Sequence, residues 1–556
     1  TLSGINISST TNGNALSLNF AASQSGNGTL TLNNTTINTN GGNLTATANN
    51  ASGTAISLTG TNNITLGAGN GTINGTSNSS VGIKSTNSTL NVDVGAGSSL
   101  TLNGNSSANY GVQLSGSTIN LNNNGSLSIV GTANNATNTS AGRGIYLNGT
   151  NAITANKGNL TLIGTSDAYV GIFAQNTTNI TVGQNANLTF VGTSNSSVGI
   201  YSTGTIWNAD VYSGSSLTFN GTSATNYGVQ FTSSNLTLNG NSNNNGSVKF
   251  IGSISNTTSA GTGIQIDGNT NWNISKGSVT LNGSSDAFVG VSTQNNFNVT
   301  VGENATFAIN GTSNSSIGYR ILGNLNTTQA QNSTITLNGT SNSSVGVYVP
   351  SATLNSEIAS NASYTINGQS YSNFAVQFSG ATIKLNNASL NNGSMAINGK
   401  ATTVNATNTN ATSIGRGIQI DGNTNFILNR GNLTLTGSSE NYVGIYLAAT
   451  LNITAAQNTT LMFTGASNNS VGIYSARSAV NTNLSTGAKL NLTGTSVANF
   501  GVQFSGTTLN ITGNGTTNIT GNNTGSNTFS SVDANGTAIT TDNTGYGLLL
   551  DGNGNI

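Results

Sequence analysis

Acidic residues at one recurring position are the first candidates for chemistry in this chain. Asp167, Asp286 and Glu440 occupy the same place in three related phrases, GTSDAYVG, GSSDAFVG and GSSENYVG. Carboxylate pairs cleave glycosidic bonds when they lie about 5 to 9.5 Å apart. Here each carboxylate stands alone in its phrase, and the chain has no histidine to activate a serine and no cysteine to bind a metal. We therefore expect a protein that is not an enzyme and that holds no metal or cofactor.

Other charged residues recur in the same isolated way. Single charges at equivalent places are typical of solvated turns, and they form two further sets: Asp267, Asp421 and Asp551, and Lys157, Lys276 and Arg430.

Aromatic residues are the second candidates, because flat rings bind sugars and apolar surfaces. A phrase of the form Val-Gly-Ile-Tyr returns along the chain, and the residue after its inward isoleucine is expected to face outward. This predicts a glycan- or receptor-binding face made of two short ladders: Tyr146, Phe173 and Tyr201, and then Tyr446 and Tyr474. The alternative is stacking that only stabilises the sheet. Four other rings are expected to point into the core: Tyr110, Tyr227, Phe374 and Phe500.

Asparagine followed two places later by serine or threonine is frequent, and this pattern accepts N-linked sugars where the producing cell has the transferase. The candidate acceptors are Asn33, Asn34, Asn63, Asn78, Asn159 and Asn187.

The element that must position all these residues is a repeat of 27 to 29 residues, which the returning glycine of Val-Gly-Ile-Tyr marks. The unit from Gly171 to Val198 contains three short segments in which apolar and polar residues alternate, as in half-buried strands. The inward residues of this unit are predicted in pairs: Val170 with Ile172, Ile180 with Val182, and Leu188 with Phe190.

Three strands per coil, joined by polar turns, predict an all-β fold, a right-handed parallel β-helix with coils of about 28 residues. Successive coils would stack about 4.8 Å apart, and each would bury its apolar ridge against its neighbours. Helices are disfavoured because glycine, asparagine and β-branched residues dominate the chain.

A longer period lies above the coil. The phrase Tyr110-Gly111-Val112-Gln113-Leu114 has three later counterparts, so four coils form one super-repeat. We expect one continuous β-helix over 1–556, a fragment of a longer exoprotein, with super-repeats at about 111–227, 228–374, 375–500 and, in part, 501–556. The coil after each phrase is longer, which predicts edge loops such as 132–143 and 400–416.

Composition excludes several classes of partner. Twelve basic and twelve acidic residues leave a net charge of zero, so the chain lacks the positive field that nucleic acid or an anionic membrane requires. No apolar run approaches the ~20 residues of a membrane-spanning helix. We expect no nucleic-acid partner and no membrane insertion by this segment.

The repeats resemble those of filamentous haemagglutinin-type exoproteins, including sequon-rich high-molecular-weight adhesins, with autotransporter passengers as near relatives. The likeness rests on runs such as GGNLTA at Gly41, GNLTL at Gly158 and GNLTLT at Gly431. The resemblance implies export through an outer-membrane secretion pore (two-partner secretion) and display on the bacterial surface.

Together these observations predict an extracellular adhesin that attaches the bacterium to a host-cell or matrix surface, glycan or protein, or to neighbouring cells. The alternative is a structural subunit of a filament, biofilm matrix or surface layer that associates with itself.

Overall fold

The computed structural model describes residues 1–9, 14–22, 26–134, 142–240, 244–254, 261–387, 391–402, 415–525 and 547–551. Within these ranges every regular element is a β-strand, and none is a helix. The chain divides into two units, Thr1–Gly283 and Ser284–Ile556, and each is described by itself.

A coil of the first unit contains three strands. One coil consists of β16 (Arg143–Asn148), β17 (Asn151–Ala155) and β18 (Asn159–Ser166). Each strand pairs in parallel with the equivalent strand of the preceding coil, which consists in the same order of β13 (Tyr110–Ser115), β14 (Thr118–Leu121) and β15 (Ser126–Ala133). We name the faces that these three strands build A1, A2 and B, in chain order. The predicted parallel β-solenoid with three strands per coil is confirmed.

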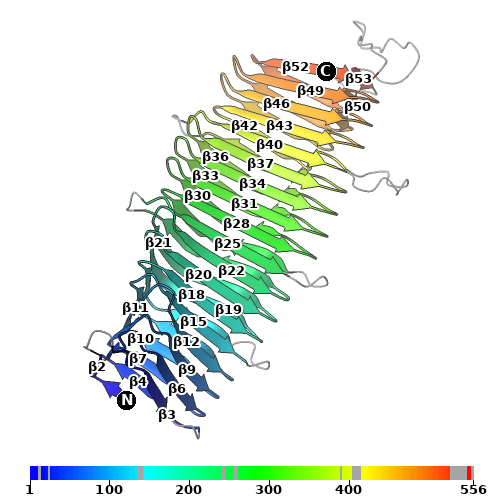
Figure 1. Ribbon diagram of the computed structural model, residues 1–556. Coiled ribbons are helices and arrows are strands. Elements are labelled where there is room, and N and C mark those ends of the chain that lie inside the picture. Colours follow the sequence, from blue (N-terminus) through cyan, green and yellow to red (C-terminus); the bar gives the residue numbers. More distant parts are fainter. Residues whose placement is uncertain are drawn as a thin grey trace. The chain divides into compact units, whose positions relative to one another are not determined.

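Within each unit, Figure 1 shows the strands of successive coils lying side by side. In two coils of the first unit the A1 and A2 strands merge into one long strand, namely β19 (Val170–Val182) and β21 (Val198–Val211). The remaining face B strands of this unit that enter the argument below are β9 (Gly71–Ser77), β12 (Ser99–Ser106), β20 (Asn187–Ser194), β22 (Ser216–Ser223) and β25 (Ser247–Ile254).

The second unit repeats the same coil. One of its coils consists of β35 (Val347–Pro350), β36 (Thr353–Ile358) and β37 (Ser363–Ser370). Each strand pairs in parallel with the equivalent strand of the next coil, which consists in the same order of β38 (Val376–Ser379), β39 (Thr382–Leu385) and β40 (Ser394–Ala401). The other face B strands are β31 (Thr306–Ser313), β34 (Thr334–Ser341), β43 (Asn432–Ser439), β46 (Thr460–Ser467), β49 (Lys489–Ser496) and β52 (Thr516–Asn523).

The interior is filled by the apolar residues of each alternating segment. Ile172, Ile180, Val182, Leu188 and Phe190 are all buried, as predicted. Rings stack from coil to coil, because equivalent residues lie directly above one another in an in-register parallel sheet. The stack runs through Phe190, Phe219 and Phe250, with 4.8 Å between successive ring centroids.

A buried serine closes the corner after many of the face B strands, whereas Ala133, Ile254 and Ala401 stand at this position in β15, β25 and β40. The Ser194 hydroxyl donates to the carbonyl oxygen of Tyr169 in the preceding coil (2.5 Å) and accepts a bond from the backbone N–H of Ser197 (2.9 Å). Ser106, Ser166, Ser223, Ser370 and Ser496 accept the same bond from the N–H three residues ahead. The serine therefore satisfies backbone groups that the turn removes from the ladder.

A seam of paired glycines joins face B to face A1. Each pair consists of a glycine inside a face B strand and the glycine that opens the next A1 strand, for example Gly164 and Gly171. A Cβ atom added to Gly164 would lie closer than 3.0 Å to the carbonyl oxygen of Gly171, and the same relation links Gly104 to Gly111. Backbones touch along this seam, so the face B glycine of each pair is required by close approach.

The seam interrupts the strict alternation of side chains. The register pairs Val170 with Val198 and Ile172 with Ile200 but leaves Gly171 unpaired. Val170 packs in one cluster with Phe173, which points to the side opposite to its neighbour Ile172. The residue before the glycine therefore does not share the side of the residue after it. This irregularity decides where several aromatic rings lie.

Candidate functional site: aromatic clusters and a polar groove

The outer surface of face A1 in the first unit carries two parallel rows of side chains. One row runs Tyr110, Arg143, Val170, Val198 and Tyr227 from coil to coil. The second row runs Gln113, Tyr146, Phe173, Tyr201 and Gln230 in the same strands. The predicted ladder of Tyr146, Phe173 and Tyr201 is formed, with ring centroids 5.6 and 5.2 Å apart.

An arginine of the first row lies beside this ladder. The guanidinium carbon of Arg143 is 4.4 Å from the centroid of Phe173, 4.9 Å from Tyr146, 5.2 Å from Tyr169 and 5.3 Å from Tyr110. Its Nη1 also donates to the Tyr110 hydroxyl (3.2 Å). A planar cation attracts the faces of aromatic rings, so Arg143 holds together rings from three coils. We call Tyr110, Arg143, Tyr146, Tyr169, Phe173 and Tyr201 the first aromatic cluster.

The cluster is more enclosed than the sequence suggests. Phe173, predicted to be exposed, is only 3% exposed, because it packs with Val170 and Val198 beneath half-buried tyrosines. Val170 is buried, but the prediction that it points inward with Ile172 is wrong, because it packs in this outer group with Phe173. Burial also raises the pKa of the Tyr146 hydroxyl, an effect that the Arg143 charge opposes. Tyr146 and Tyr201 remain half-buried, and they present the accessible rings.

The prediction that Tyr110, Tyr227, Phe374 and Phe500 are core rings is wrong. All four are half-buried, and Tyr110 contacts Tyr146 with 4.9 Å between ring centroids. The reason is the glycine seam, which breaks the two-residue alternation between each ring and the following valine.

The second unit contains a related group, which we call the second aromatic cluster: Phe374, Arg416, Tyr442, Tyr446 and Tyr474. The guanidinium carbon of Arg416 is 4.1 Å from the centroid of Tyr446 and 5.2 Å from each of Phe374 and Tyr442. Tyr446 and Tyr474 stack with centroids 5.4 Å apart, as the sequence predicts. Arg143 and Arg416 each lie at the end of a predicted edge loop, 132–143 and 400–416. Residues 135–141 and 403–414 of these loops lie outside the described residues.

Glutamines beside the second cluster bind an aspartate rather than one another. Asp421 Oδ2 accepts bonds from Gln377 Nε2 (2.9 Å) and Gln419 Nε2 (3.0 Å), and Gln419 Oε1 accepts a bond from Arg416. Asp267 accepts the same kind of bond from Gln230 (3.1 Å) in the first unit. These half-buried aspartates are therefore structural partners of the face and not freely solvated.

The recurring turn acids also pair with asparagine. Asp167 accepts a bond from Asn195 (3.0 Å) and Asp286 from Asn314 (2.6 Å), each one coil further on. Among the described residues, no group of three or more His, Cys, Asp or Glu side chains lies where it could hold a metal ion.

The candidate sugar acceptors fall into two groups. Asn34, Asn78, Asn159 and Asn187 are exposed, whereas Asn33 and Asn63 are half-buried in strands. The Asn63 amide accepts a bond from Asn91 (2.8 Å), and the Asn187 amide donates to Asn159 (3.1 Å). A glycan on the Asn187 nitrogen would replace one of the two amide hydrogens available for this donated bond, whereas the bond that the Asn63 oxygen accepts would not lose a hydrogen.

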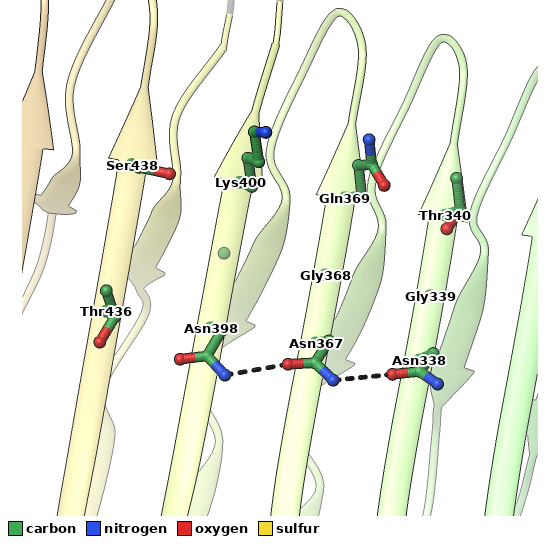
Figure 2. Close-up of a pocket in the computed structure, with 11 residues that line it drawn as sticks. Asn338, Gly339, Thr340, Asn367, Gly368, Gln369, Asn398, Lys400, Thr436 and Ser438 are labelled. Carbon is green, nitrogen blue, oxygen red and sulfur yellow. Dashed lines mark hydrogen bonds between the residues drawn. The ribbon is translucent and has the colours of Figure 1, made fainter.

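A polar groove lies on face B of the second unit, across β34, β37, β40 and β43. Its volume is about 590 Å³. Figure 2 shows one row of Asn338, Asn367, Asn398 and Thr436, a second row of Thr340, Gln369, Lys400 and Ser438, and glycines between them. The asparagines form a ladder in which Asn398 donates to Asn367 (2.9 Å) and Asn367 to Asn338 (2.8 Å).

Sequence reasoning missed this groove and both arginines. The groove has a weak signal, namely an asparagine directly before the face B glycine in successive repeats. The arginines appear in the sequence as single charges within GRGIYLNG and GRGIQIDG. Only the stacking of coils reveals that rings from different repeats surround them.

No protein-family model matches this chain, and no curated protein matches it significantly. The described residues also contain no helix that is long and apolar enough to cross a membrane.

Proposed function

We propose that this chain belongs to a bacterial adhesin, exported and displayed at the cell surface, that attaches the cell to host or neighbouring cells. The observation that carries the proposal is the pair of aromatic clusters on the outer surface of face A1. A β-solenoid needs its interior rings for stability, but it has no packing requirement for rings outside. Half-buried tyrosines held by a half-buried arginine are an ordered surface that sugars and apolar groups bind.

The arginines favour recognition over simple stacking. Arg143 and Arg416 fix the orientation of the rings around them, so little side-chain entropy is lost when a partner binds. Aromatic and arginine side chains are also the residues most enriched at the energetic centres of protein interfaces. These properties suit attachment to a glycan or protein surface.

The test is binding of the fluorescently labelled chain to cultured epithelial cells, measured by flow cytometry. The variant Tyr201→Ser with Tyr474→Ser removes an accessible ring from each cluster, and we expect cell binding to fall about fivefold or more. Tyr212→Ser is the matched control, because Tyr212 is 40% exposed and outside both clusters. The proposal is rejected if the unaltered chain shows no saturable binding, or if the double variant binds as well as the control.

A further inference from the structure

We infer that the polar groove of the second unit binds an extended glycan chain that lies along the stacking direction of the coils. The inference deepens the proposed function by naming a ligand class and a site, and it rests on that function for its biological role. The groove crosses four strands, which gives it a length of about 14 Å at the usual strand spacing. Its floor is the strand backbone at Gly339, Gly368 and Gly399, where an added Cβ would point toward face A1 and not into the groove. The outward side chains form the two rows on either side, so the backbone between the rows is open to a ligand.

The asparagine ladder fixes a row of hydrogen-bonding groups. A side-chain amide has two N–H donors and an oxygen with two lone pairs. In Asn367 the ladder uses one donor, toward Asn338, and one lone pair, toward Asn398. One donor and one lone pair per asparagine remain, held in place without further loss of entropy. Sugar hydroxyls both donate and accept, and therefore complement this row.

The repeat of the groove matches a polymer. Equivalent groups recur at each coil, about 4.8 Å apart, which is close to the advance of one sugar unit in an extended polysaccharide. Gln369 and Lys400 continue the second wall in the same register. Lys400 is the one charged residue among those that line the groove, so a neutral glycan or one with a carboxylate near Lys400 fits.

Other ligand classes fit poorly. A peptide strand would need unpaired backbone groups, but β37 and β40 each have a strand on both sides. Nucleic acid would need several cations along the groove. A lipid would need large apolar side chains along the groove, whereas the residues that line it are glycines, amides, hydroxyls and Lys400.

The first unit provides a natural comparison. In its face B, the position before the seam glycine is occupied by Val130, Ile163 and Val191, in strands that pair in register. Valine is therefore compatible with the fold at this position. Asn367→Val should remove the amide and leave the coil intact.

The experiment is a glycan array with neutral β-1,4-glucan and galacturonate oligosaccharides, followed by titration calorimetry with the tightest binder. We expect the full chain to bind at least one oligosaccharide and Asn367→Val to weaken it about tenfold or more, because ligand hydroxyls lose their partners. Asn452→Val is the matched control, since Asn452 is in a similar ladder with Asn425 and Asn481 outside the groove, and it should bind normally. Lys400→Gln should weaken the galacturonate series more than the neutral series.

Two results would overturn the inference: no oligosaccharide binds the unaltered chain, or Asn367→Val binds as tightly as Asn452→Val. The assay uses soluble oligosaccharides rather than cells. If the tyrosine double variant loses cell attachment while Asn367→Val binds oligosaccharide normally, the groove is rejected and the proposed function stands. If the tyrosine double variant attaches to cells normally while Asn367→Val binds oligosaccharide more weakly, the role of the aromatic clusters is rejected and the glycan site in the groove stands.

Discussion

Replacement of Gly164 by alanine tests the glycine seam, and the sign of its effect is informative. In a strand interior, alanine is normally favoured over glycine by roughly 0.5–1 kcal/mol, because glycine loses more conformational entropy on folding. The backbone of Gly164 does not have a positive φ, so the conformation itself permits alanine. Without a steric conflict, Gly164→Ala should therefore stabilise the coil.

The structure predicts the opposite result. The added Cβ would lie 2.7 Å from the carbonyl carbon of Gly171 and 2.7 Å from Cγ1 of Ile172, besides its conflict with the Gly171 oxygen. The two Gly171 atoms belong to the backbone and cannot rotate away, so face A1 must move away from face B. Overpacking of this kind costs about 1–3 kcal/mol, which exceeds the propensity gain.

Hydrogen exchange measured by mass spectrometry is the appropriate assay, because a stack of repeats does not unfold as one two-state unit. A local loss of 1–3 kcal/mol should speed exchange through local opening about 5- to 150-fold. We expect this effect in peptides that cover 159–173 and in the adjoining coils.

Two further variants control the interpretation. Gly97 has a φ of +80° and nothing within 4 Å of an added Cβ, so Gly97→Ala reports backbone strain alone, about 1–2 kcal/mol. Gly171→Ala should be milder than Gly164→Ala, because Ala375 occupies the corresponding place in the second unit and is buried there. Exchange in Gly164→Ala that is equal to or slower than in the unaltered chain would refute the seam.

Two further predictions concern buried hydroxyls. Ser194→Ala should leave the Tyr169 carbonyl and the Ser197 N–H unpaired, at a local cost in stability of about 1–3 kcal/mol. Faster hydrogen exchange in residues 195–200 would show this loss. The control Ser196→Ala, at an exposed position, should change exchange little. Burial raises the pKa of Tyr364 to about 12, while an unfolded tyrosine ionises near pH 10. The contribution of Tyr364 to stability should therefore be constant below pH 10 and be lost between pH 10 and about 12. Tyr364→Phe should remove one late-ionising tyrosine from the absorbance titration, and an unchanged titration would contradict its burial.

The sequence by itself determined the coil and its interior. Alternation along a strand is a local property, because successive side chains point to opposite faces. Leu188 and Phe190 could therefore be assigned to the interior, and the period of the glycine phrase gave the coil length. The ladders of Tyr146, Phe173 and Tyr201 and of Tyr446 and Tyr474 followed from the same two rules.

Only the tertiary structure decided how the faces meet. Gly164 and Gly171 are seven residues apart in the chain, and nothing in a strand pattern indicates that their backbones touch. The equivalent contact of Gly104 with Gly111 accompanies the outward position of Tyr110, and stacked coils bring Arg143 against rings from three coils. The groove beside Asn367 likewise exists because equivalent residues of separate coils align. The physical reason is that side-chain alternation depends on each strand alone, whereas close approach between faces depends on the volume of every residue at the corner.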